Sequence, residues 1–183
     1  MAALLAGWGA AIVDADAISR QLTAPGGAAL AAIQTQFGRN YLNGQGALNR
    51  DAMRELVFSQ PAKKSALEAI LHPLVAAEIK RQATLAEEAL APCIVFDVPL
   101  LVESPHWRQQ VEQIVVVDCT QRVQLQRVMR RNGWTAEATQ QVIGNQAGRL
   151  QRLEAADICI FNDTVSLQAL ALLVRQLANR FGL

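Results

Sequence analysis

Short runs of apolar residues, most of them ending on an acid, recur along this chain. They cover Ala10 to Asp14, Pro92 to Asp97, Ile114 to Asp118 and Asp157 to Phe161. Continuous apolar runs of this length are typical of strands that are buried on both faces of a parallel sheet. The pattern therefore predicts four strands, and the first three carry an acid at the carboxyl end.

The segments between these runs have the periodicity and the end signals of helices. Ala2 to Gly9 resembles the end of a helix, and Asp16 is expected to be the N-cap of a short helix that ends at Leu22. Further helices are predicted over 28–37, 49–58, 61–71, 73–90, 120–132, 135–144, 146–154 and 164–181, with His72-Pro73 as an interruption. Strands that alternate with helices predict an α/β fold with a parallel sheet, whose ligands bind beyond the carboxyl ends of the strands.

Composition narrows the class of protein. The 183 residues carry a formal net charge of +1, and 51% of them are hydrophobic. These values predict one compact domain, or one domain with a small lobe, and argue against disorder. Because 17 basic residues nearly balance 16 acidic ones, binding of nucleic acid through bulk charge is also disfavoured.

The cysteines and the apolar segments bear on the compartment. Cys93, Cys119 and Cys159 form no C-x-x-C pair and are odd in number, which argues against a disulfide framework or a zinc ribbon and favours a reducing environment. The longest apolar stretch, Ala2 to Val13, is too short to span a bilayer and lacks the positive flank of a signal peptide. We therefore expect a cytoplasmic protein without a membrane partner.

Acids at the predicted strand ends are the first candidates for chemistry. Asp14 and Asp16 could supply a general base for a hydroxyl and an anchor for magnesium, or they could simply end a strand and cap a helix. Asp97 begins a turn that runs through a proline to Glu103, and strand-end acids of this kind often hold the hydration shell of a metal. The alternative for Asp97 is a strand stop followed by a surface turn.

Basic residues form the second group of candidates. The arginines in question are Arg127, Arg130, Arg131, Arg149 and Arg152. Their spacings of three and four place pairs on common helix faces, which suits a lid that closes over phosphates, although a solvated helix face has the same pattern. His72 precedes a proline and could donate to a substrate phosphate or carbonyl, or it could be a packed or capping residue.

These features in this order resemble the dephospho-coenzyme A kinase family, which belongs to the P-loop nucleoside-monophosphate-kinase-like group. The resemblance covers essentially the whole chain. Its markers are Val13 to Asp16 with Ile18 and Arg20, Pro25-Gly26, Leu48 to Phe58, Leu71 to Leu74, Pro99 to Glu103, Val115 to Asp118, Gln124 to Arg127 with Arg131, Gln146 with Arg149 and Arg152, and Ala156 to Asn162.

The resemblance implies a P-loop kinase-like parallel sheet flanked by helices, and transfer of a phosphoryl group from ATP to the ribose 3′-hydroxyl of dephospho-coenzyme A. It implies one kinase-like domain over 1–183, with a core at 1–24 and 92–183, a helical substrate-binding insertion at about 25–91 and a lid at about 132–152. The implied catalytic residues are Asp16, as base or orienter of the hydroxyl, and Arg149. The implied binding residues are Arg20, His72, Leu100 and Leu101 for the acceptor, Arg127, Arg131, Arg152 and Asn162 for the nucleotide, and Asp97, indirectly, for Mg²⁺.

One family element is missing from the printed residues. The family opens with a strand and a G-x-x-x-x-G-K-S/T loop that cradles phosphates, and no such run occurs between residues 1 and 183. By the resemblance, Met1 falls just after that loop, so either the true start lies upstream or the chain is a truncated form. Two alternatives to the kinase therefore stay open at this point: a binding module that holds the acceptor without transferring phosphate, and a kinase for another small hydroxyl acceptor.

Overall fold

The computed structural model describes the backbone of residues 1–183 and every side chain except those of Pro105 and His106. The chain divides into two compact units. The amino-terminal unit comprises residues 2–98 and 181–183, and the carboxyl-terminal unit comprises residue 1 and residues 99–180. Among the described residues, no helix is both long enough and apolar enough to cross a membrane.

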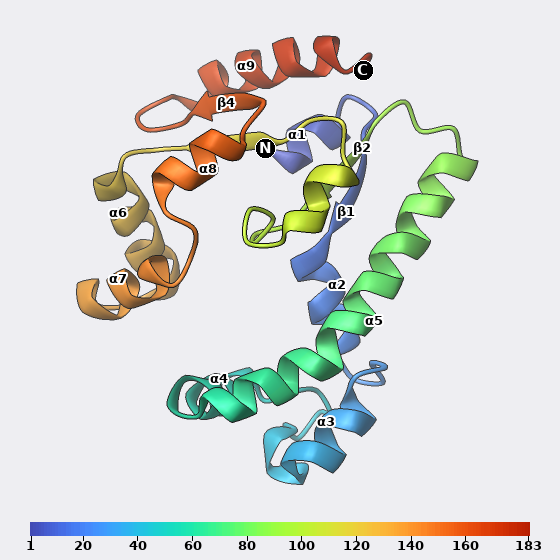
Figure 1. Cartoon of the computed structure of the whole chain (residues 1–183), viewed down its shortest axis with the longest axis vertical. Coiled ribbons are helices and arrows are strands. Elements are labelled where there is room, and N and C mark those ends of the chain that lie inside the picture. Colours follow the sequence, from blue (N-terminus) through green and yellow to red (C-terminus); the bar gives the residue numbers. More distant parts are fainter. The chain divides into compact units, whose positions relative to one another are not determined.

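The amino-terminal unit holds a parallel pair of strands and a group of helices (Figure 1). Its elements are α1 (Ala2–Ala6), β1 (Ala11–Asp14), α2 (Ala15–Leu22), α3 (Leu30–Phe37), the 3₁₀ turn η1 (Arg39–Tyr41), α4 (Arg50–Ser59), α5 (Pro61–Glu88) and β2 (Ile94–Asp97). β1 pairs with β2 in parallel, and the register sets Asp14 opposite Asp97. The acids that end these two strands therefore lie at the same edge.

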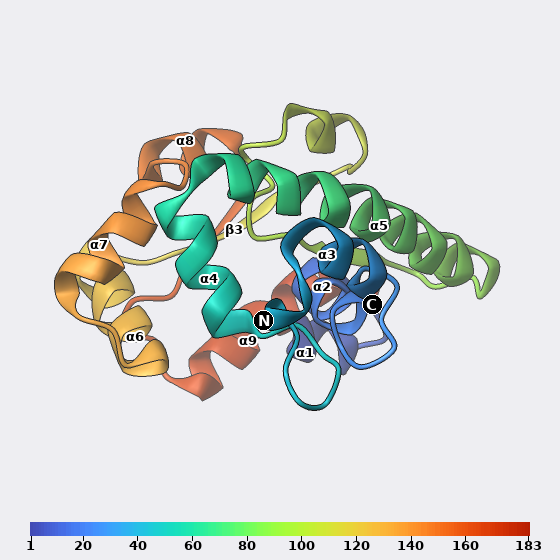
Figure 2. The ribbon, with the colours of Figure 1, turned by 90° about the horizontal axis from the view of Figure 1, so that it is seen from below.

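An apolar cluster holds the helical part of this unit together. Its fully buried members are Ala29, just before α3, and Ile33 on α3. Met53 of α4 is almost as buried. Side chains from both sides of Pro73 in α5 pack against this cluster. α4 leads into the amino-terminal end of α5, and the two helices contact each other (Figure 2).

The carboxyl-terminal unit repeats the parallel pairing. Its elements are the 3₁₀ turn η2 (Pro105–Gln109), β3 (Val115–Asp118), α6 (Gln121–Asn132), α7 (Ala136–Gly144), α8 (Arg149–Ala155), β4 (Ile158–Phe161) and α9 (Leu167–Arg180). β3 pairs with β4 in parallel, with Val115 opposite Ile158 and Asp118 opposite Phe161. On α9 the buried residues Leu170, Val174 and Leu177 recur at the helical spacing of four and three.

The structure confirms the α/β class, the parallel pairing and all four predicted strands to within two residues. The predicted starts and ends of three helices are also close, since Asn49 and Thr135 cap α4 and α7, and Gly133 follows the end of α6 in the left-handed conformation. Thr120, predicted as the first residue of its helix, is instead the N-cap of α6. The sheet, however, consists of two separate two-stranded pairs rather than one continuous sheet. α8 and α9 each begin three residues later than predicted.

Two sequence predictions are wrong. The N-cap of α2 is Asp14 and not Asp16, because the helix starts directly at the strand end and the Asp14 carboxylate accepts the Ala17 N–H at 2.8 Å. His72-Pro73 does not interrupt the chain, since α5 is continuous over its 28 residues with Pro73 inside it. The proline removes one backbone donor, and α5 bends near its middle (Figure 1), but packing on both sides of Pro73 keeps the helix whole.

Candidate active site

Three acids gather at the carboxyl edge of β1 and β2. Asp14 and Asp97 end the two paired strands, and Asp16 follows two residues after Asp14 in the first turn of α2. The pKa of the Asp97 carboxyl is raised, first because it is partly removed from water and then because Asp14 and Asp16 bring like charges near it. Nearby positive groups therefore do not fully neutralise the negative charge of the three carboxylates at this edge.

The three acids are not equally engaged. Asp14 caps α2 and also faces the Arg20 guanidinium, with 3.7 Å between Oδ2 and Nη2. Asp16 is exposed, and no donor among the described side chains forms a hydrogen bond with its carboxylate. Because Asp14 takes the cap, the purely structural alternative for Asp16, that of a helix cap, no longer holds. The Asp16 carboxylate is therefore left open to solvent.

A shallow hollow of about 400 Å³ adjoins these acids through Arg20. Its polar lining includes Thr23, Asn43, Asn49 and Arg50. The buried Thr23 hydroxyl donates to the Ser19 carbonyl at 2.8 Å and accepts from Arg50 Nη2 at 2.9 Å, so it fixes the direction of the Arg50 guanidinium. Two arginines at one polar hollow suit a ligand that carries phosphate groups.

The other residues predicted to bind the acceptor come from other elements. His72 is exposed on α5. Leu100 and Leu101 occupy the turn at 99–103 of the carboxyl-terminal unit, and Leu100 is half exposed. Within the described residues, no three His, Cys, Asp or Glu side chains come together closely enough to hold a metal ion.

In the carboxyl-terminal unit, Asp118 and Arg149 form a two-point ion pair. Arg149 donates from Nε to Oδ1 at 2.9 Å and from Nη2 to Oδ2 at 2.6 Å. The Asp118 side chain is only 4% exposed, whereas that of Arg149 is 50% exposed. The Arg149 hydrogen bonds hold the pKa of Asp118 below its usual range, although burial acts in the opposite direction.

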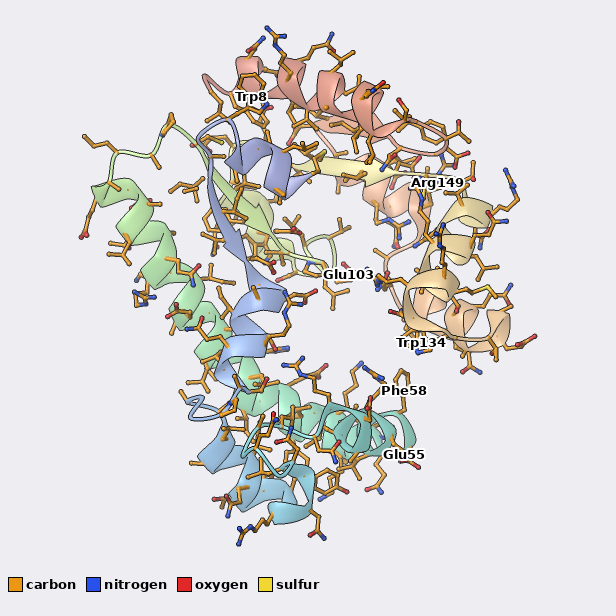
Figure 3. All side chains as sticks on the ribbon, turned by 180° about the vertical axis from the view of Figure 1, so that it is seen from behind. Trp8, Glu55, Phe58, Glu103, Trp134 and Arg149 are labelled. Carbon is orange, nitrogen blue, oxygen red and sulfur yellow. The ribbon has the colours of Figure 1, made fainter. Side chains whose placement is uncertain are left out.

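The turn before Arg149 is held on both sides. The Glu103 carboxylate accepts the Ala147 N–H at 2.7 Å, and Arg152 Nη1 donates to the Ala147 carbonyl at 2.6 Å. Figure 3 labels Glu103 and Arg149, which come from the loop after β2 and from the first residue of α8. Arg152 therefore positions the start of α8 through the backbone.

Arg127 stabilises the loop that follows β4. It donates to the carbonyls of Asn162 at 2.7 Å and Asp163 at 2.9 Å. The Asn162 N–H in turn donates to the Asp118 carbonyl at 2.7 Å. Arg131 is exposed on α6 and forms only a long hydrogen bond of 3.4 Å with Asn132. The arginines predicted to face phosphates thus have different partners. Arg127 binds the loop after β4, Arg152 binds the backbone before α8, and Arg149 binds the buried Asp118.

Sequence reasoning missed two functional candidates. Asp118 was noted as a strand-end acid, but its partner Arg149 lies 31 residues later. Arg50 received no role, because its contact with Thr23 spans 27 residues. In both cases the sequence shows only a charged residue at the end of a strand or the start of a helix. Such residues are too common for the sequence alone to indicate which of them has a functional partner.

Comparison with known proteins gives a consistent result. The model of the family described as dephospho-CoA kinase matches residues 1–168. The dephospho-CoA kinase of Albidiferax ferrireducens is 51% identical over 183 residues, which are 100% of this chain and 86% of that protein. The dephospho-CoA kinase of Burkholderia lata is 47% identical over 94% of this chain and 84% of its own length.

Solved structures agree on the fold. The crystal structure of TT1252 from Thermus thermophilus superposes with a TM-score of 0.75 at 27% identity, and covers 98% of this chain and 88% of that one. The dephospho-CoA kinase from Campylobacter jejuni superposes with a TM-score of 0.65 at 21% identity, over 98% of this chain and 94% of the other.

Proposed function

The chain belongs to the dephospho-CoA kinase family, and from that membership we propose that it phosphorylates the ribose 3′-hydroxyl of dephospho-coenzyme A. ATP supplies the γ-phosphoryl group, and the products are coenzyme A and ADP, so the reaction is the last step of coenzyme A biosynthesis. The name of the relatives supplies the acceptor, dephospho-CoA, and membership of a kinase family implies ATP as the donor. The structural observation that best supports this reaction is the carboxylate of Asp16. It is exposed just after the carboxyl end of β1 and is not used to cap α2.

Asp16 acts as general base or orienter for the accepting hydroxyl. A carboxylate with no donor of its own can accept the hydroxyl proton as the oxygen attacks phosphorus. Asp14 cannot share this role easily, because it already accepts from Ala17 and faces Arg20. The difference between the two acids favours Asp16 for this role.

The helical residues 25–91 bind the acceptor, with the hollow at Arg20 and Arg50 as the place for its phosphate groups. His72 and the Leu100-Leu101 turn contribute further contacts to the acceptor. Residues 132–152 serve as a lid, and the family's pattern assigns phosphate or nucleotide contacts to Arg127, Arg131, Arg152 and Asn162. Arg149 stabilises the charge that spreads over the transferred phosphoryl oxygens.

Mg²⁺ neutralises charge on the nucleotide phosphates in reactions of this class. It prefers oxygen ligands and usually binds proteins through one or two carboxylates, water and substrate phosphates. The strand-end acids fit that donor set, with Asp97 as the residue that would hold a hydrated ion, and their mutual repulsion favours a cation nearby.

The test is formation of coenzyme A from ATP, Mg²⁺ and dephospho-coenzyme A, followed by chromatography. Because the printed residues contain no G-x-x-x-x-G-K-S/T run, the chain is compared with a loop-extended form that carries the family's strand and phosphate loop ahead of Met1. The loop-extended form is expected to make coenzyme A, and to use adenosine or pantetheine far more slowly. Preference for another hydroxyl acceptor, or no product at all, would refute the proposed function.

A further inference from the structure

Two carboxylate–arginine pairs in the described part of the carboxyl-terminal unit differ in place and in burial. Asp157 pairs with Arg108 and accepts the Ile114 N–H, so this pair sits at the amino ends of β3 and β4. Asp118 pairs with Arg149 at the carboxyl end of β3. Ligands of parallel sheets bind at carboxyl ends, so only the second pair lies where substrate is expected.

From this contrast we propose that Asp118 is a positioning residue, which fixes the Arg149 guanidinium for phosphoryl transfer. The inference rests on the proposed function. The Asp118 side chain is buried and its carboxylate is bound by Arg149, so it acts through Arg149 rather than on the substrate.

The geometry of the contact leaves one end of the guanidinium available. Asp118 engages Nε and Nη2, so that the plane of the group is fixed and both Nη1 hydrogens stay uncommitted to the carboxylate. A planar guanidinium held along one edge can present the other edge to phosphate oxygens at a defined angle. A single contact would not fix that angle.

The backbones on both sides of the Asp118–Arg149 contact are held in place, which lets the buried Asp118 position the half-exposed Arg149 side chain. The Asp118 backbone is fixed by strand pairing with β4, and its carbonyl accepts the Asn162 N–H. At the other end, the backbone just before Arg149 is held by Glu103 and Arg152. The remaining freedom of Arg149 lies in its side-chain torsions, and Asp118 removes it before substrate arrives.

Stability alone does not account for this arrangement. Burial costs the Asp118 carboxylate much of its hydration, and a buried ion pair is often no better for folding than apolar residues of similar size. The exposed Arg108–Asp157 pair has a structural role at the other end of the strands, because Asp157 also accepts the Ile114 N–H just before β3. Orientation of Arg149 therefore gives the buried carboxylate at the ligand-facing end a role in addition to its contribution to folding.

The test uses the loop-extended form with Asp118→Asn, Arg149→Ala and the double variant, and Asp157→Asn is the matched control. Asp118→Asn is expected to lower kcat about 10- to 100-fold while the KM values for ATP and acceptor stay within about threefold. The double variant should be no slower than Arg149→Ala, because Asp118 acts only through Arg149. Asp157→Asn should leave kcat within about threefold even where it lowers the melting temperature.

A spectroscopic readout separates this inference from the proposed function. In ¹H–¹⁵N spectra, the Arg149 Nε–H signal should be protected from exchange in the parent and in Asp157→Asn, and unprotected in Asp118→Asn. Protected Arg149 together with no transfer to dephospho-coenzyme A would refute the proposed reaction while leaving the pair intact. Equal kcat in Asp118→Asn and parent, or losses that multiply in the double variant, would overturn the positioning role.

Arg149→Lys covers the case in which Asp118→Asn does not fold. Lysine keeps the positive charge but cannot form the two-point contact with the carboxylate. We expect kcat to fall about tenfold or more in this variant, with little change in KM. A rate within threefold of the parent would show that charge near the phosphate suffices and that orientation by Asp118 does not matter.

Discussion

The two parallel strand pairs are built alike and end differently. β1 and β2 end in Asp14 and Asp97, which face each other, whereas β3 ends in Asp118 opposite the apolar Phe161. At the first edge the pKa of Asp97 is raised, and at the second edge the pKa of Asp118 is lowered. The same sequence feature, an acid after an apolar run, therefore has two electrostatic outcomes.

Neighbouring cations account for the difference. At the second edge Arg149 binds Asp118 directly at two points. At the first edge Arg20 reaches only Asp14, at 3.7 Å and in an exposed setting, where an ion pair contributes little. The first edge thus keeps an exposed carboxylate, Asp16, beside its paired acids, whereas the carboxylate of the second edge is bound by Arg149.

The largest expected effect comes from the free carboxylate of the first edge. In the loop-extended form, Asp16→Asn should lower turnover by about 10²- to 10⁴-fold, because the amide can no longer accept the hydroxyl proton. Acceptor binding and the melting temperature should stay close to those of the parent, since Asp16 does not cap α2. Steady-state kinetics and thermal melts measure both quantities, and turnover within threefold of the parent would remove Asp16 from the mechanism.

Arg149→Ala tests the second edge. We expect kcat to fall by about 10²- to 10³-fold, because a guanidinium that meets developing charge on phosphate oxygens contributes most in the transition state. The KM for the acceptor should change little. If KM rises while kcat is unchanged, Arg149 belongs to substrate binding and the two edges do not differ in the way described.

Part of this comparison was available from the sequence. Continuous apolar runs predicted the strands and their terminal acids, because a strand buried on both faces tolerates few polar residues. The partner of each acid was not predictable, since Arg149 reaches Asp118 across 31 residues and only the fold brings them together. His72-Pro73 was misjudged for a related reason, because packing of α5 on both sides of Pro73 outweighs the local tendency to break.

Arg50 tests how the first edge binds an anionic substrate, because phosphate groups that approach its acids need positive charge nearby. Arg50→Gln should weaken binding of dephospho-coenzyme A about tenfold, because one charge-assisted contact with phosphate is lost in an open, hydrated hollow. Calorimetric titration measures this without any transfer of phosphate. Arg39→Gln is the matched control, since Arg39 is exposed in the same unit but does not line the hollow. Equal losses in both variants would mean that only general charge matters.

The smallest expected effect concerns stability and has opposite signs at the two edges. The raised pKa of Asp97 means that the folded state binds more protons than the unfolded state between the two pKa values, so the ionised carboxylate destabilises the fold at neutral pH. Asp97→Asn should therefore raise the free energy of unfolding at pH 7.5, by at most about 1 kcal/mol since water screens this partly exposed group. Asp118 is the reverse case, because its lowered pKa adds stability that is present above the unfolded pKa and is lost as pH falls through the folded pKa.

Asp118→Asn should accordingly lower the free energy of unfolding at pH 7.5 by about 1 kcal/mol, because the buried side chain then lacks its charged contact with Arg149. Urea denaturation at pH 7.5 and pH 4, with a chelator to remove Mg²⁺, measures both variants against the parent. Both differences should shrink at pH 4, because the raised pKa of Asp97 lets its carboxyl take up a proton at higher pH than an ordinary aspartate, and the contribution of Asp118 falls below the unfolded pKa. If the two substitutions change stability in the same direction at pH 7.5, the strand-end acids are electrostatically equivalent, and the contrast between a free and a paired carboxylate is wrong.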